Sequence, residues 1–192
     1  MGIEYEWKFR ATPAQLSAAE AAVTGQTRYF QMHTTYYDTP SGRLSARRYT
    51  LRRRMENSDS ICALKTPDED GRREWEVKCD RIEDAIDLLC KLGAPEALRS
   101  LTDEGLVALC GAKFTRIART VSLPDCTVEL ALDQGILYGG SRELPLCEIE
   151  VELKSGSRDA CDAYAVALAQ QLALTPEPQS KFRRALDLCK GA

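Results

Sequence analysis

The sequence predicts an α+β protein dominated by antiparallel strands. Three observations support this. Several segments alternate apolar and charged residues with a period of two, short polar turns join consecutive segments of this kind, and a few stretches with helical spacing separate them. The 192 residues suit one domain with its own hydrophobic core. Because no linker or low-complexity stretch interrupts the chain, we expect a single domain over residues 1–192.

The first predicted strand, Ile3 to Arg10, shows the alternation most clearly. Tyr5, Trp7 and Phe9 would share one face of this strand, and the charged residues between them would share the other. Such a strand is half-buried, with its apolar face packed against another layer. The pattern therefore predicts that charge gathers on one side of the sheet.

The other elements follow in order from the same two periodicities. Further strands are expected at 27–38, 48–55, 60–66, 72–79, 113–123, 127–137 and 146–154. Helices are expected at 14–23, 80–92, 102–109, 157–172 and 180–189. Thr12 and Ser157 are candidate N-caps, Pro13 suits a first helical turn, and Gly25 ends the first helix.

The composition restricts the partners that the protein can have. With 26 basic and 29 acidic residues the net charge is −3, which argues against bulk nucleic-acid binding. No apolar run reaches membrane-spanning length, and Glu4, Glu6 and Lys8 interrupt what would be a secretory signal. The eight cysteines and the one histidine, His33, lack zinc-site spacing. We therefore expect a cytoplasmic protein with packed, reduced thiols, and the alternative is a secreted protein with a disulfide framework. The oligomeric state, monomer or homodimer, stays open.

Charged residues two positions apart recur in most of the predicted strands, so they share a face. These sets are Glu4, Glu6 and Lys8; Arg52 and Arg54; Arg72, Glu74 and Glu76; Glu129 and Asp133; and Glu148, Glu150 and Glu152. For any one strand, the solvated face of an open sheet explains the pattern. The set as a whole does not fit that explanation well, because three same-face carboxylates repel one another. Grouped carboxylates suit Mg²⁺ or Mn²⁺, and grouped arginines suit phosphate.

Closing the sheet into a barrel would bring the acidic and basic sets into one lumen. A barrel with room for a ligand needs roughly eight strands. The sequence offers about eight candidate strands, a number that fits. This interpretation predicts a charged interior with the apolar faces turned outward against the helices.

The opening Glu4-Tyr5-Glu6-Trp7-Lys8 resembles the ExExK signature of the CYTH superfamily of triphosphate tunnel metalloenzymes. Other family motifs follow in order, and together they cover nearly the whole chain. They are similar to Tyr36–Pro40 (YYDTP), Leu51–Arg54 (LRxR), Leu64–Lys65 (TLK), Arg72–Glu76 (RxExE), Arg116, Glu129–Asp133 (ExxxD), Glu148–Glu152 (ExExE), and Ser180–Lys181 with Arg184 (SKxxRG). The departures at Ala63, Arg119 and Ala185 remove no implied ligand, so they bear on substrate preference.

The resemblance implies an eight-stranded antiparallel β-barrel tunnel with flanking helices, and it implies roles for the shared-face residues. Glu4, Glu6, Glu150 and Glu152 would hold a first Mg²⁺ or Mn²⁺ ion. A second ion or its waters would contact Glu74, Glu76, Glu129, Asp133 and Glu148, although Glu74, Glu129 and Asp133 could instead form structural ion pairs. The triphosphate would bind Lys8, Arg52, Arg54, Lys65, Arg72, Arg116, Lys181 and Arg184. Of these, the residues expected to act in catalysis are Lys8, Arg52, Arg54, Lys65 and Lys181.

Three functions are compatible with this resemblance. The first is metal-dependent hydrolysis of inorganic triphosphate or of a small organic triphosphate such as thiamine triphosphate, by in-line attack of water on a terminal phosphorus. The alternative is a class IV-like adenylyl cyclase, which converts ATP to cyclic AMP and pyrophosphate. The third is a binding module without turnover. The full acidic set argues against that module, because a pure anion binder gains nothing from so many carboxylates.

Overall fold

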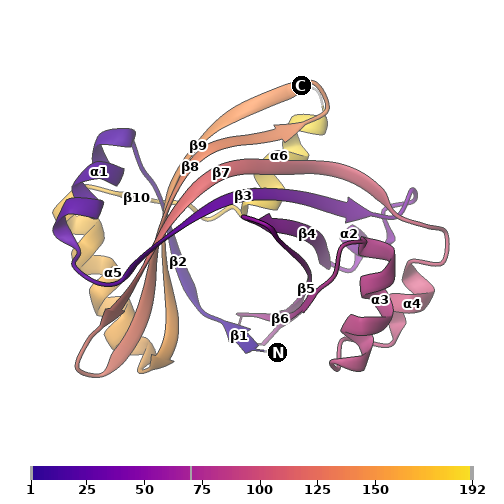
Figure 1. Cartoon of the computed structure of the whole chain (residues 1–192), viewed down its shortest axis with the longest axis horizontal. Helices are drawn as coiled ribbons and strands as arrows, with labels where there is room; N and C mark the ends of the chain where they lie inside the picture. The colour runs from indigo at the N-terminus through magenta and orange to yellow at the C-terminus, as the bar shows by residue number, and fades with distance from the viewer. Residues whose placement is uncertain (1, 70, 191–192) are drawn as a thin grey trace.

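A computed structural model describes residues 2–69 and 71–190, except for the side chains of residues 2 and 3. Ten strands within these ranges form one antiparallel sheet in the order β1-β6-β5-β4-β3-β7-β8-β9-β2-β10 (Figure 1). Their bounds are β1 Gly2–Glu4, β2 Glu6–Arg10, β3 Thr27–Asp38, β4 Thr50–Glu56, β5 Asp59–Asp68, β6 Gly71–Lys78, β7 Val107–Ser122, β8 Cys126–Gly139, β9 Arg142–Gly156 and β10 Thr175–Pro176. The predicted α+β class with antiparallel strands is confirmed.

The first predicted strand is divided at Tyr5, and its two halves pair with different edges of the sheet. β1 pairs with β6, and β2 pairs with β9. Tyr5 itself accepts a backbone hydrogen bond from Leu153 in β9 at 2.9 Å. The two edges of the sheet are thus joined by the chain at Tyr5 rather than by an unbroken ladder. With β1 and β2 taken as one segment and the two-residue β10 left out, eight strand segments surround the central space (Figure 1).

The strands alternate as the sequence predicts, with their apolar faces turned outward against helices. Helices α1 (Pro13–Ala22) and α5 (Arg158–Leu172) cover one side of the sheet, where they pack on residues such as Phe9, Leu130 and Ile149. Helices α3 (Ile82–Lys91) and α4 (Ala97–Leu101) cover the opposite side, against residues such as Trp75. The figure shows the two groups at opposite ends of the long axis (Figure 1).

The two predicted N-caps, Thr12 and Ser157, are confirmed. The Thr12 hydroxyl accepts from the Gln15 backbone N–H, and the Gln15 side chain accepts from the Thr12 N–H, which makes a capping box. Ser157 and Ser180 cap α5 and α6 (Lys181–Cys189) by accepting from the backbone N–H three residues ahead. The short helix α2 (Arg43–Ala46) and the two-residue strand β10 were not predicted.

The expected helix at 102–109 is wrong. The helix α4 lies earlier, at Ala97–Leu101, and β7 already begins at Val107. Gly105, with φ +90°, ends the helical path because it adopts a left-handed conformation that favours glycine. The next residues then pair with β3, Val107 opposite Asp38 and Ala108 opposite Tyr37. This long-range pairing overrides the local helical spacing.

Strands β8 and β9 extend beyond the ring as a hairpin. They pair as far as Gly139 opposite Arg142, so β9 begins before the predicted residue 146. Helix α6 packs on the extended parts of β7, β8 and β9 through a third apolar cluster that includes Phe114, Leu137 and Phe182 (Figure 1). The first turn of α6 thereby lies beside the central space. None of the helices in the described ranges is long and apolar enough to cross a membrane.

Candidate active site

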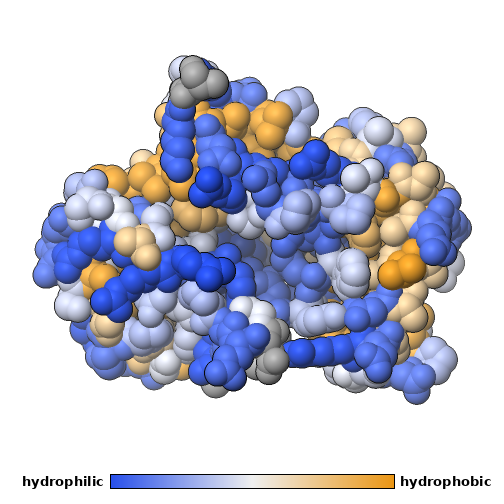
Figure 2. Space-filling model, turned by 180° about the vertical axis from the view of Figure 1, so that it is seen from behind, coloured by the Kyte–Doolittle hydropathy of each residue, from blue (hydrophilic) through white to orange (hydrophobic). Residues whose placement is uncertain are grey.

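The inward faces of the strands surround a hydrophilic cavity of about 280 Å³. Seen from behind, the molecule is hollowed at its centre, and the wall of the hollow is mostly hydrophilic (Figure 2). All eight strand segments of the ring and the first turn of α6 contribute to the lining. The predicted site residues among the lining are Glu4, Glu6, Lys8, Arg52, Arg54, Lys65, Arg72, Glu74, Glu76, Arg116, Glu129, Glu150, Glu152 and Lys181.

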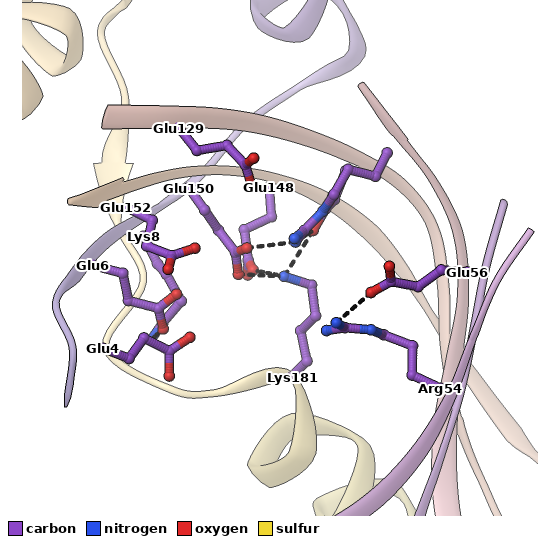
Figure 3. Close-up of polar contacts among 12 residues, drawn as sticks. Glu4, Glu6, Lys8, Arg54, Glu56, Glu129, Glu148, Glu150, Glu152 and Lys181 are labelled. Atoms are coloured by element: carbon purple, nitrogen blue, oxygen red, sulfur yellow. Dashed lines mark hydrogen bonds and ion pairs between the residues drawn. The ribbon is translucent and has the colours of Figure 1, made fainter. Parts of the chain in front are cut away.

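An acidic wall is produced by the register of three neighbouring strands. Glu6 of β2 lies opposite Glu152 of β9, and Glu152 lies opposite Glu129 of β8. Glu4 and Glu150 flank this row, so carboxylates gather on one side of the cavity (Figure 3). Burial and the neighbouring Glu150 and Glu4 raise the pKa of Glu6. Burial also raises the pKa of Glu152, despite an ion pair with Lys154 at 2.9 Å.

A basic wall is formed by β4. Arg52 Nη2 contacts Glu74 at 3.0 Å, and Arg54 pairs with Glu56 and, at 3.4 Å, with Glu76. Burial opposes protonation of Arg52, but Glu74, Tyr36, Glu76 and Glu4 together outweigh it, and the pKa rises above its usual value. Burial and the neighbouring Arg52 lower the pKa of Arg54.

Both arginines keep a donor that is free for a ligand. The Nε atoms of Arg52 and Arg54 are buried and have no hydrogen-bond partner within the described part of the chain. A buried donor without an acceptor costs free energy, about 1–3 kcal/mol in typical cases. An oxygen-rich ligand in the cavity would supply the missing acceptors.

Two further cations line the cavity between the acidic and basic walls. Lys65 on β5 contacts Glu4 at 2.5 Å and Glu74 at 3.6 Å. Arg72 on β6 donates to Thr50 Oγ1 at 2.9 Å, and burial lowers its pKa. Arg72 is thus held by a neutral hydroxyl rather than by a carboxylate in the contacts that the structure records, and its positive charge stays available to an anion.

The floor of the cavity is an ion-pair cluster centred on Lys181 (Figure 3). Lys181 Nζ lies 2.9 Å from Asp133 and 2.6 Å from Glu150, and it also contacts Glu148. Arg116 binds both carboxylate oxygens of Asp133 at 2.7 Å and contacts Glu150 at 2.5 Å. Burial opposes the charge on Lys181, but Asp133 and Glu150 raise its pKa. The same cations hold the pKa of Glu150 well below its usual range, against the effect of burial.

The acidic residues differ in their fitness for a divalent cation. Asp133, Glu148 and Glu150 each offer an oxygen within 4.8 Å of the others, a spacing that could hold a metal ion. However, Lys181 and Arg116 already contact this group. Glu6 and Glu152 carry raised pKa values from burial, so their repulsive row is the part of the wall that a cation would relieve.

Three predicted site residues lie behind the lining. Asp133 and Glu148 are fully buried beneath it, and Arg184 contacts Glu148 from α6. The cavity also includes charged residues that the sequence interpretation missed: Arg28, Glu56 and Lys154. Lys154 continues the same-face series of Glu148, Glu150 and Glu152, and Glu56 continues that of Arg52 and Arg54. Strand alternation alone could therefore have predicted that Lys154 and Glu56 face the cavity. The apolar lining residues include Phe30, Met32 and Phe114.

Two residues noted in the sequence do not line the cavity. Arg119 points away from it and donates to the backbone carbonyls of Glu20 and Val23 at the end of α1. A cation suits that position, because it satisfies carbonyls at the helix C-terminus. His33 lies on an exposed part of β3, 3.0 Å from the Tyr138 hydroxyl. His33 is not among the residues that line the cavity, so it is not placed to act as a general base there.

An antiparallel ring of strands around a charged cavity defines a tunnel-type protein. Residues 2–186 match the model of the CYTH domain, and the chain belongs to this family. Over 128 residues, the chain is 30% identical to an inorganic triphosphatase from Haemophilus influenzae, a match that covers 64% of this chain. The match spans 36% of that relative, so the chain corresponds to well under half of its length.

Solved structures share the fold. A protein from Hippeastrum, whose description combines the name adenylyl cyclase with a dominant triphosphatase activity, has a TM-score of 0.68 at 17% identity, covering 97% of both chains. A protein from Pyrococcus horikoshii has a TM-score of 0.62 at 21% identity, covering 96% of this chain and 98% of that one. At such identities these likenesses concern the fold.

Proposed function

We propose that this protein hydrolyses a triphosphate with the help of a divalent cation bound in the cavity. The observation that carries the proposal is the separation of charge within one enclosed space. Glu6 and Glu152, two facing carboxylates with raised pKa values, share the cavity with Arg52 and Arg54, whose buried Nε donors have no partner among the described residues. Such a space suits a cation and a polyanion together, as the CYTH family membership and the triphosphatase relative also suggest.

The basic residues bind and orient the polyphosphate chain. Arg52, Arg54, Lys65, Arg72 and Lys8 surround the centre of the cavity, and Arg116 and Lys181 supply charge at its floor. Arginine can bind phosphate oxygens through two parallel N–H bonds, which fixes orientation as well as charge. Arg184 lies behind the lining and acts through Glu148, so we assign it a supporting role.

Glu4, Glu6 and Glu152 would hold a Mg²⁺ or Mn²⁺ ion, because oxygen ligands suit both. Glu150, the fourth expected ligand, contacts Lys181 with one oxygen and Arg116 with the other, so it would join the ion only by giving up one of these contacts. A bound ion of this kind neutralises phosphate charge and makes water a better nucleophile. Three other carboxylates hold basic residues of the cavity in place. Glu74 contacts Arg52 and Lys65, and Glu76 contacts Arg54. Glu129 contacts Arg28 and Lys154. Asp133 and Glu148 hold Lys181 in the same way.

The reaction breaks one P–O–P linkage. Water oxygen bonds to the terminal phosphorus, the bridging oxygen leaves with pyrophosphate, and the surplus proton passes to solvent. Lys8, Arg52 and Arg54 stabilise the charge that spreads over the phosphate oxygens in the transition state. Lys181, held by three carboxylates, places a fixed positive charge at the cavity floor.

A second candidate is a nucleotide cyclase, in which a ribose hydroxyl replaces water. The observation that favours it is the apolar part of the lining, where Phe30, Met32 and Phe114 offer a surface for a base. The name of the Hippeastrum protein combines both activities. In this chain the apolar residues also belong to the packing of α6, so we give the hydrolase preference.

One experiment separates these functions. The protein is incubated with Mg²⁺ or Mn²⁺ and, in parallel, with inorganic triphosphate, thiamine triphosphate or ATP, and the products are resolved. Release of phosphate that depends on the metal supports the hydrolase, and cyclic AMP with pyrophosphate supports the cyclase. Tight binding without any product would overturn both.

The expected cytoplasmic location stays a prediction, supported by eight free thiols.

A further inference from the structure

Glu177 is a buried carboxylate outside the cavity lining and outside every motif of the sequence interpretation. Its side chain is 0% exposed. It lies between Pro176 and Pro178, directly after β10. Proline fixes its own φ and restricts the residue before it to extended conformations, so the backbone at Glu177 has little freedom. A rigid backbone presents this carboxylate in one direction.

Glu177 joins β2 to α6. Its backbone N–H donates to the Lys8 carbonyl at 2.8 Å. Its carboxylate accepts from Arg10 Nε at 2.6 Å and from the Gln179 backbone N–H at 3.0 Å, and it contacts Arg184 Nη1 at 3.4 Å. Burial raises the pKa of Glu177, but Arg10, Gln179 and Arg184 outweigh it, so the pKa falls below its usual value.

Charges alternate from this carboxylate to the cavity. Arg184, which contacts Glu177 through Nη1, contacts Glu148 through Nη2. Glu148 in turn contacts Lys181, which points from the N-terminus of α6 toward the cavity floor (Figure 3). An unbroken series of ion pairs thus runs from Arg10, 61% exposed on the outer surface, to Lys181.

We propose that Glu177 is a positioning residue that fixes the first turn of α6, and with it Lys181, against the cavity. This inference rests on the proposed function for the role of Lys181, but the placement itself is a property of the protein without substrate. Lys181 and Arg184 are both on α6, three residues apart, so one helical turn carries both charges. In the contacts that the structure records, the acidic partners of Arg184 are Glu148 and Glu177. Loss of the Glu177 carboxylate therefore leaves Arg184 with Glu148 alone, on the side of the cavity.

The first test measures the position of α6 without any substrate. Glu177→Gln keeps the size of the side chain but replaces a carboxylate oxygen by an NH₂ group, which faces donors on all sides. We expect faster hydrogen–deuterium exchange in the segment 180–186 and unchanged exchange in α5. The matched control is Glu104→Gln, which removes a carboxylate that accepts from Ser41 and lies in an exposed loop.

The second test is a kinetic double-mutant cycle on triphosphate hydrolysis. Glu177→Gln should lower kcat by about 10- to 100-fold with a smaller change in KM, because a small displacement of a catalytic group has effects of this order. In the Lys181→Met background, the same change should alter kcat by less than about twofold. A merely structural role would instead give equal losses in both backgrounds, and that result would overturn the proposal.

A second variant, Arg10→Met, tests the same ion pair in case Glu177→Gln fails to fold. Arg10 is largely exposed, so its removal leaves the core intact, and we expect the same kinetic pattern in weaker form. Unchanged exchange at 180–186 in both Glu177→Gln and Arg10→Met would also contradict the inference. If the wild-type protein hydrolyses no triphosphate, the proposed function fails, whereas the exchange measurement still decides whether Glu177 places α6.

Discussion

Glu6 lies directly opposite Glu152 in the register between β2 and β9, and each carboxylate contacts one lysine. Lys8 lies 2.9 Å from Glu6, and Lys154 lies 2.9 Å from Glu152. These contacts do not offset burial, because the pKa values of both carboxylates remain raised. The pair therefore opposes folding when both residues are ionised, and a divalent cation would reverse that effect.

The first prediction concerns metal binding and stability. At about 100 times its Kd, Mg²⁺ or Mn²⁺ should stabilise the wild-type protein by about 2.7 kcal/mol, which raises Tm by about 5–10 °C. Glu6→Gln and Glu152→Gln should each lose most of this gain and most triphosphatase activity, without a lower Tm in EDTA. Differential scanning fluorimetry checks this, with the exposed hairpin variant Glu143→Gln as control. An undiminished metal effect in either variant would exclude that residue as a ligand.

The second prediction concerns Arg52 and Arg54. Each Ala substitution removes a charge-assisted contact of roughly 1.5–3 kcal/mol. We expect kcat/KM to fall by about 10- to 150-fold for inorganic triphosphate and for ATP alike. The control is Arg53→Ala, since Arg53 lies between them on the other face and donates to Ser60 at 3.0 Å. A loss confined to ATP would place these arginines at the nucleoside and favour the cyclase.

The third prediction concerns the buried ion-pair cluster at the cavity floor. Lys181→Met leaves Asp133 and Glu148 without their shared cation, and breaking a buried ion pair on one side typically costs about 3–5 kcal/mol. Urea unfolding at neutral pH measures the loss. Adding Glu148→Gln should recover part of it, because one uncompensated charge disappears. Lys91→Met, on the exposed end of α3, is the control; a loss below about 1 kcal/mol at Lys181 would contradict the prediction.

The fourth prediction concerns thiol reactivity. Cys189 is exposed, whereas burial raises the pKa of both Cys62 and Cys110 to about 12. Only the thiolate reacts with iodoacetamide, and the fraction of thiolate at pH 8 falls about tenfold for each unit of raised pKa. We therefore expect Cys189 to be alkylated first in the native protein, and Cys62 and Cys110 only after unfolding. Peptide mass spectrometry with Cys189→Ser as control checks this order; early labelling of Cys62 would refute the buried site.

Strand alternation explains how much of this structure could be predicted from sequence. Whether a side chain such as Glu6 or Glu150 faces inward depends on the parity of its position, which is a local property. The inward faces of β2, β4, β6, β8 and β9 were therefore predicted correctly, and the same parity also covers Lys154 and Glu56. The assignment of individual residues to metal or phosphate stays a prediction.

Other features depend on contacts between distant segments, which periodicity does not contain. The partners of Lys181 come from β8 and β9, more than thirty positions earlier in the chain than the helix that carries it. The extension of β7 along β3 replaced the helix expected at 102–109, because pairing with a neighbouring strand outweighs local spacing. In the sequence, only the two prolines beside Glu177 set this residue apart, and they do not indicate its partners.

The division of the first strand at Tyr5 also has a consequence for how the chain folds. Residues 2–10 are made long before residues 142–156, yet β2 finds its partner only when that later segment has been made. Pairing over so long a separation is slow, and β2 and β8 keep open edges until β9 joins them. Nascent chains that stall before β9 would therefore expose hydrogen-bonding edges to one another, and they would depend on chaperones to stay apart.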